Sequence, residues 1–142
     1  MPTFTKLTLI AAALGVGFFA NDIIQWFQIA TSKPSLDQYC LVTTNGCQTD
    51  GAKIRVDRDT SQPLVPTQMT VTWPAAQSES LLLTLQGHEM EMGTLVFKLE
   101  QNAYGDYLGE IVLPVCTSDA MTWYGEVSDG SQSLKTSIRM ER

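Results

Sequence analysis

The 142-residue sequence has little basic charge, only one histidine and no block of charge of either sign. Its formal net charge is −6, and residues 36–142 hold seven Lys or Arg against fourteen Asp or Glu. A nucleic-acid-binding surface needs clustered basic side chains to neutralise phosphates, and none occur here. An acidic domain also gains nothing from anionic lipid head groups. These absences argue against nucleic acids and anionic lipid surfaces as partners.

The motifs of common enzymes are also missing. Because His88 is the only histidine, most zinc-hydrolase arrangements are excluded, since they combine several imidazole ligands. The chain has no Gly-x-Ser-x-Gly elbow, phosphate-binding loop, dinucleotide fingerprint or Cys-x-x-Cys pair. The sequence therefore predicts a protein that is not an enzyme.

One long apolar stretch lies at the N-terminus. Residues 7–20 follow Lys6, Asn21 and Asp22 interrupt the stretch, and residues 23–30 resume it. A spanning helix needs about 20 residues, whereas residues 7–20 alone have the length of a signal peptide. Cleavage after Ala20 would put Phe18 where a small residue is needed. The sequence thus favours an uncleaved transmembrane helix within residues 1–30 over a cleaved signal.

The flanking residues predict how this helix is oriented. Lys6 places the short N-terminal side in the cytoplasm, and Trp26 with Phe27 would anchor the outer interface. In a bacterium this gives a single-pass inner-membrane protein whose C-terminal domain lies in the periplasm, after a polar linker at 31–37. Asn21 and Asp22 lie either at the outer boundary or against another membrane subunit, because a carboxylate within lipid is costly.

Residues 38–142 are predicted to form an all-β domain, because short apolar and β-branched runs recur between turn residues. Met69, Val71 and Trp73 alternate with threonines, which is typical of a strand with one buried face. The expected strands are Tyr39–Thr43, Lys53–Asp57, Gln68–Trp73, Glu79–Gln86, Leu95–Gln101, Tyr107–Leu113, Met121–Ser128 and Ser133–Met140. This number of strands favours an immunoglobulin-like antiparallel β-sandwich, with a small barrel as the alternative.

Three cysteines make an odd count. In an oxidising compartment we expect one disulfide and one free thiol. A bridge from Cys40 to Cys47 is favoured because it is local. The alternative is a bridge from either Cys40 or Cys47 to Cys116. A free Cys116 would be a small buried side chain or a thiolate metal ligand.

The segment Gly87-His88-Glu89-Met90-Glu91-Met92-Gly93 is the one stretch with distinctive ligand chemistry. Imidazole and thioether donors suit soft ions such as Cu(I). In a regular strand, His88 and Met92 would lie about 13 Å apart, too far for one ion. A copper site therefore requires a bent hairpin loop, completed by Cys116 or Met121, with Trp123 able to cover the ion. The alternative is an exposed loop with two gap-filling methionines.

The layout of the chain resembles the FixH and YtkA-like group. The residues that carry the likeness are the helix at 7–30, the methionines of Gly87–Gly93, and Gly105–Glu110 followed by Met121-Thr122-Trp123. The resemblance implies an N-terminal membrane helix followed by an exported immunoglobulin-like domain. It also implies a role in periplasmic copper handling or in assembly of heme-copper (cbb3-type) cytochrome oxidases, with His88, Met90, Met92 and Met121 as candidate ligands.

Two functions are therefore expected as alternatives. The first is a non-enzymatic accessory protein that handles copper during assembly of a respiratory complex. The second is a metal-free structural interaction module, in which the helix docks against a membrane protein complex. The Gly87–Gly93 loop favours the first function, and Asn21 and Asp22 favour the second.

Overall fold

The computed structural model describes residues 2–31 and 34–142 of the chain. They fall into two compact units, Met1–Pro34 and Ser35–Arg142. Ser32 and Lys33 of the predicted linker lie outside the described residues. The remainder of that linker includes the start of a short 3-10 helix, η1 (Leu36–Gln38), whose first turn is capped because the Ser35 hydroxyl accepts from the Asp37 N–H.

The first unit contains one helix, α1 (Thr3–Thr31). Residues Thr3–Gln28 are long and apolar enough to cross a membrane, although a signal sequence would meet the same criteria. Asn21 and Asp22 lie within α1, and the helix continues through them without a break. The two polar residues therefore divide the apolar stretch in sequence but not in backbone structure.

The second unit is an all-β domain, as predicted. Every expected strand is present, with bounds shifted by a few residues, and β2 is one more that the sequence did not indicate. The strands are β1 (Cys40–Leu41), β2 (Cys47–Thr49), β3 (Ala52–Val56), β4 (Thr67–Thr72), β5 (Ser80–Gly87), β6 (Thr94–Gln101), β7 (Tyr107–Ile111), β8 (Ala120–Ser128) and β9 (Ser133–Glu141).

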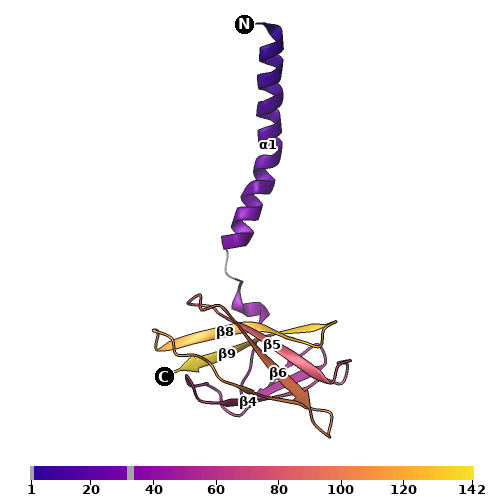
Figure 1. The fold of residues 1–142 in the computed structure, drawn as a ribbon, viewed down its shortest axis with the longest axis vertical. Coiled ribbons are helices and arrows are strands. Elements are labelled where there is room, and N and C mark those ends of the chain that lie inside the picture. Colours follow the sequence, from indigo (N-terminus) through magenta and orange to yellow (C-terminus); the bar gives the residue numbers. More distant parts are fainter. Residues whose placement is uncertain (1, 32–33) are drawn as a thin grey trace. The chain divides into compact units, whose positions relative to one another are not determined.

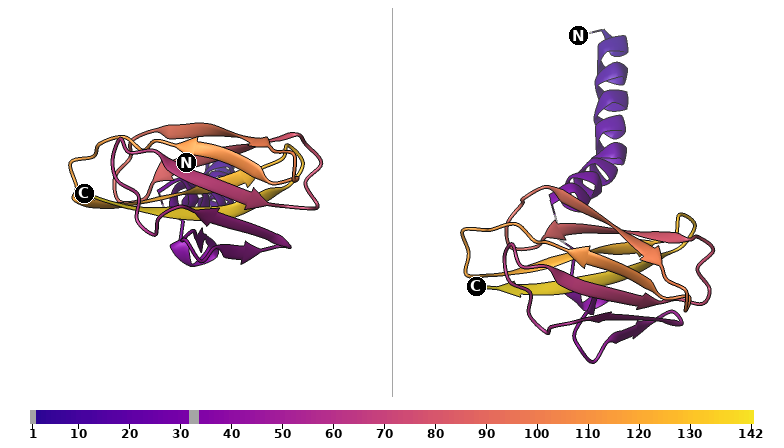
Figure 2. Two further views of the ribbon diagram at one scale, coloured as in Figure 1. Left: turned by 90° about the horizontal axis from the view of Figure 1, so that it is seen from below. Right: turned by 60° about the horizontal axis from the view of Figure 1, so that its bottom comes forward.

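The strands stack in two layers, with β8 and β9 in one layer and β4 in the other (Figures 1 and 2). Their hydrogen-bonded order is β1-β9-β8-β5-β6-β7-β4-β3-β2, in which only β1 and β9 run parallel. The β4–β5 and β7–β8 connections cross between the layers, as in immunoglobulin-like sandwiches. β6 and β7 pair only at Glu100–Leu108 and Gln101–Tyr107, where the two layers join.

Alternation along the strands builds the core between the layers. Met69, Val71 and Trp73 are buried, as their spacing predicts. From the opposite layer, Leu83 and Trp123 are fully buried in the same cluster. Because every second residue points inward, each strand needs only three or four apolar side chains to supply its share of the core.

A disulfide joins Cys40 to Cys47, with the two Cα atoms 6.0 Å apart. This is the local pairing that the sequence favours. Cys40 belongs to β1 and Cys47 to β2, the two strands at opposite ends of the sheet order. The bridge thus fastens the two open edges of the sandwich to each other.

Candidate functional site

Residues 88–93 form the loop of a hairpin between β5 and β6, the bent geometry that a metal site would require. Gly93 takes the left-handed conformation, with φ of 82°, which glycine adopts without strain. At Gly87, the terminal methyl of Met121 and the Met90 carbonyl occupy the space that a side chain would need. Glycine at position 87 therefore lets the loop fold back over β8.

The histidine lies on the outer face of the β5–β8 layer. The His88 N–H donates to the Thr122 carbonyl over 2.9 Å. Its ring meets the Tyr124 ring edge to face, with centroids 5.8 Å apart. Tyr124 points outward, whereas Met121 and Trp123 alternate with it and are buried. The structure therefore directs His88 and Met121 to opposite faces of the layer.

The loop methionines lie on the inner side of this end of the sandwich. Met90 and Met92 are partly buried and pack against the core. The Thr117 hydroxyl donates to the Met90 sulfur over 3.7 Å, which brings the β5–β6 loop against the β7–β8 connection. Cys116 is the neighbouring residue in that connection. The structure thus gathers Met90, Met121 and the Cys116 loop at one end of the domain.

Cys116 is the free cysteine and is buried. Its thiol donates to the Ser118 carbonyl over 3.2 Å, and the Arg142 guanidinium donates to the Cys116 carbonyl. Within residues 2–31 and 34–142, no group of three or more His, Cys, Asp or Glu side chains is arranged to hold a metal. Any metal site at this end would therefore depend on thioether ligands.

The indole N–H of Trp123 has no hydrogen-bond partner in the described part of the chain, although it is fully buried. Trp123 is paired across the sheet with Gly87 and Ile138. It therefore lies at the same end as Met90 and Met121. Buried donors without a partner are uncommon in native proteins.

A side-chain clamp holds the loop in place, and the sequence did not indicate it. The Glu89 carboxylate accepts from the Thr122 backbone N–H over 2.7 Å. Arg139 of β9 contacts the same carboxylate at 3.4 Å and donates to the Thr122 hydroxyl over 2.9 Å. β5 turns away from β8 at this point, so the Thr122 N–H has no strand carbonyl to bind, and the Glu89 carboxylate takes its place. No sequence pattern marks a carboxylate that binds a backbone amide so distant in the chain.

Electrostatics support this clamp. Burial raises the pKa of the Glu89 carboxyl, but the hydrogen bond from Thr122 and the charge of Arg139 lower it more. The net pKa therefore lies below its usual range. The carboxylate is thus the form that holds the loop at neutral pH.

An aromatic cluster on the outer face was also missed by the sequence interpretation. The rings of Tyr39 and Tyr124 are 5.2 Å apart, and His88 contacts Tyr124 from the other side. The Lys135 ammonium lies 5.5 Å from the Tyr39 ring centroid. Alternation could have placed Tyr124 outward, but only strand pairing brings Tyr39 beside it.

Asn21 and Asp22, the predicted membrane-partner contacts, are exposed on α1. The Thr8 hydroxyl, a polar group near the other end of the same helix, instead donates to the Phe4 and Thr5 carbonyls. Asn21 and Asp22 therefore differ from Thr8 in having no side-chain hydrogen bond to their own helix within the described residues.

A comparison with models of known protein families found no match, and a comparison with curated proteins found none either. The likeness to the FixH and YtkA-like group therefore stays an expectation based on layout.

Proposed function

We propose that this chain is a non-enzymatic accessory protein of the bacterial inner membrane, with its β-sandwich in the periplasm. The disulfide supports an extracytoplasmic location, because such bonds persist in oxidising compartments. In this proposal the helix stays in the membrane and docks against a membrane protein complex. The observation that carries it is the exposed pair Asn21 and Asp22 inside an unbroken, mainly apolar helix.

The physical reason is the cost of polar groups in lipid. A carboxylate within a spanning helix costs a few kcal/mol unless it meets water or a partner. A membrane subunit that offers hydrogen-bond donors would remove that cost for Asp22. The sandwich would then brace the same complex from the periplasmic side, as a structural interaction module.

Co-purification from membranes tests this proposal. The full-length protein and an Asn21→Leu/Asp22→Leu variant are extracted in mild detergent after cross-linking. We expect the parent to recover a membrane complex and the variant to recover at least about tenfold less, with unchanged membrane insertion. Thr8→Val is the matched control, because the Thr8 hydroxyl is satisfied within its own helix. Equal recovery by parent and double variant would contradict docking through this pair.

Copper handling is a second candidate, favoured by the contact between the Met90 sulfur and the loop that carries Cys116. Met90, Met121 and Cys116 would supply soft donors, and Trp123 would lie beside them. His88 points to the outer face, so in this proposal it takes part only if its side chain reorients. Met92 is a further thioether at the same end.

A competition titration tests the copper candidate. Cu(I) is added to the full-length protein in detergent with a chromophoric chelator, and we expect one site that holds copper at micromolar chelator. Met90→Leu/Met92→Leu keeps side-chain volume, removes two sulfurs and should abolish retention. Met69→Leu removes a core sulfur in β4 and should not. Absence of retention by the parent protein would leave the metal-free module as the function.

A further inference from the structure

Two cationic side chains of the sandwich, Lys53 and Arg55, stand apart from the others. Neither has a hydrogen bond or ion pair within the described ranges 2–31 and 34–142. The other five cations each have a polar partner: Arg58 has Asp57, Lys98 has Glu100, Arg139 has Glu89, Lys135 has Gln38, and Arg142 has the Cys116 carbonyl. In a domain with twice as many acidic as basic residues, two adjacent unpaired cations need an explanation.

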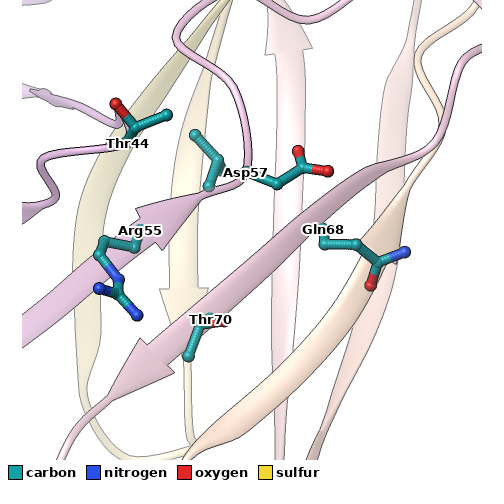
Figure 3. A pocket seen from close by; sticks show the side chains of 6 residues that line it. Thr44, Arg55, Asp57, Gln68 and Thr70 are labelled. Atoms are coloured by element: carbon teal, nitrogen blue, oxygen red, sulfur yellow. The ribbon is translucent and has the colours of Figure 1, made fainter.

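Arg55 lines a polar hollow of about 340 Å³ on the outer face of β3 and β4 (Figure 3). The lining residues are Thr44, Arg55, Val56, Asp57, Gln68 and Thr70. Arg55 and Thr70 are direct cross-strand partners, so their side chains leave the sheet side by side. Lys53, two residues before Arg55, points out from the same face of β3.

The wall of this hollow is preformed. The Thr44 N–H and hydroxyl both donate to Asp59, over 2.8 Å and 2.7 Å. Gly46 has φ of 82°, and a side chain there would come within 2.8 Å of both Arg55 Cγ and Lys53 Cε. The missing Cβ therefore gives both cationic side chains room to lie across the loop. Cys47, the next residue, fixes the loop to β1 through the disulfide.

The donors in the hollow match a carboxylate. A guanidinium offers parallel N–H groups in the fork geometry that a carboxylate accepts. The Thr70 hydroxyl has no partner within the described residues and can donate as well. Gln68 donates through Nε2 to Glu110 over 3.0 Å, which leaves its carbonyl oxygen as an acceptor.

Asp57 is the one acidic residue that lines the hollow, and its charge distinguishes between anionic ligands. Hydrogen bonding to Arg58 lowers the pKa of Asp57, so its carboxylate is charged at neutral pH. That charge would repel a phosphate dianion more strongly than a single carboxylate. The Gln68 oxygen can also accept from N–H groups next to the carboxylate, and so can the lone pairs of Asp57 that do not accept from Arg58. A peptide carries such N–H groups, whereas a small free acid such as acetate does not.

We propose that this hollow binds an acidic side chain of a peptide segment, with Arg55 as the bidentate donor and Thr70 as a second donor. The site lies on the sandwich alone and needs neither the membrane helix nor copper. It therefore goes beyond the proposed function, and its failure would leave that function untouched.

NMR titration of the full-length, ¹⁵N-labelled protein in non-ionic detergent tests the proposal. The probes are the capped peptide Gly-Glu-Gly, its Gly-Gln-Gly counterpart, sodium acetate and inorganic phosphate. We expect saturable shifts of the Arg55 Nε–H and the Thr70 amide with the glutamate peptide. Binding of the glutamine peptide should be at least about tenfold weaker, the loss expected for one charged contact. Acetate should also bind more weakly, because it lacks the peptide N–H groups, and so should phosphate, because Asp57 repels its second charge.

Single-residue variants test which side chains bind the peptide carboxylate. Arg55→Gln should weaken binding of the glutamate peptide at least about tenfold. Arg55→Lys should restore only part of that binding, because lysine lacks the two parallel N–H groups of the guanidinium. Lys98→Gln removes an exposed, paired cation of β6 and should change nothing. Asp57→Asn should strengthen the binding of phosphate several-fold, because the variant lacks the negative charge that repels it.

Three outcomes overturn the proposal. The first is no saturation by the glutamate peptide up to about 50 mM. The second is equal binding by the glutamine peptide or by Arg55→Gln. The third is acetate or phosphate binding as tightly as the glutamate peptide, which would assign the hollow to small anions instead.

Discussion

Glu89 shows how a single side chain positions the loop at the end of the sandwich. Its carboxylate accepts from Thr122 N–H while Arg139 holds it from β9. The folded state therefore favours the ionised form, and the pKa of Glu89 lies below its usual range. A group with a lowered folded pKa stabilises the protein above its unfolded pKa of about 4.3, and this contribution disappears as pH falls through the folded pKa.

We therefore predict that Glu89→Gln lowers the free energy of unfolding at pH 7 by about 0.2–1 kcal/mol, the range for exposed ion pairs. The loss should shrink as the pH falls through the folded pKa of Glu89, because the parent carboxylate is then protonated as well. Urea unfolding of the sandwich, followed by tryptophan fluorescence in detergent at several pH values, measures both effects.

Glu91→Gln is the matched control for this prediction. Glu91 is exposed in the same loop and makes no hydrogen bond or ion pair within the described residues. Its substitution should leave the free energy of unfolding unchanged at every pH. A Glu89→Gln effect that does not shrink at any acid pH at which the sandwich stays folded would mean that the charge of Glu89 does not hold the loop.

At the scale of elements, the disulfide protects the two ends of the sheet. β1 and β2 contain only two and three residues, so their ladders alone hold them weakly. Open edges also expose unpaired N–H and C=O groups, which favour pairing with other chains. Because Cys40 and Cys47 belong to these two edges, one bridge ties both to the domain.

We predict that Cys40→Ser/Cys47→Ser lowers the free energy of unfolding by about 2–3 kcal/mol, as expected for the closure of a short loop. Hydrogen exchange should quicken in β1 and β2 but not in β5 or β8. Urea unfolding with and without reductant measures the first effect, and mass spectrometry measures the second.

Cys116→Ser is the control for the disulfide prediction, because serine keeps a donor for the Ser118 carbonyl. Reductant should destabilise the parent and this control alike, and should leave the double serine variant unchanged. Faster exchange throughout the sandwich of the double variant would show that the bridge supports the whole fold rather than its edges.

At the scale of the whole molecule, the chain consists of a helix that is apolar for most of its length and an acidic β-domain. Among the residues that the structure describes, only those of the β-domain form a hydrophobic core. Thr3–Gln28 carries exposed large apolar side chains that water would solvate poorly, such as Leu14, Phe18 and Ile23. A lipid environment would solvate these side chains.

We predict that the helix is retained in the mature protein. Intact mass of the protein purified from membranes should match a chain that still contains residues 7–30, and alkaline carbonate should not extract it. A mature form that starts after Ala13 or Ala20 and is released in soluble form would instead identify a signal peptide.

The strand pattern was readable because inward and outward residues alternate with period two, whatever the partner strand. Met69, Val71 and Trp73 show this, and they are buried as expected. β2 was missed because Cys-Gln-Thr is too short to show alternation and owes its strand to pairing with β3. A hairpin loop at 87–93 was one of two geometries that Gly87 and Gly93 allow, and the structure has this loop at 88–93.

The sequence by itself determined the apolar helix and the all-β domain, because both follow from composition or spacing within a few residues. It favoured the local disulfide, and the structure decided that pairing. Tertiary structure alone decided that His88 meets Tyr124, that Glu89 holds Thr122, and that unpaired Arg55 lines a hollow with Thr70. These contacts join strands distant in the chain. The register of these strands depends on how the two layers pack, so it cannot be predicted from the local sequence.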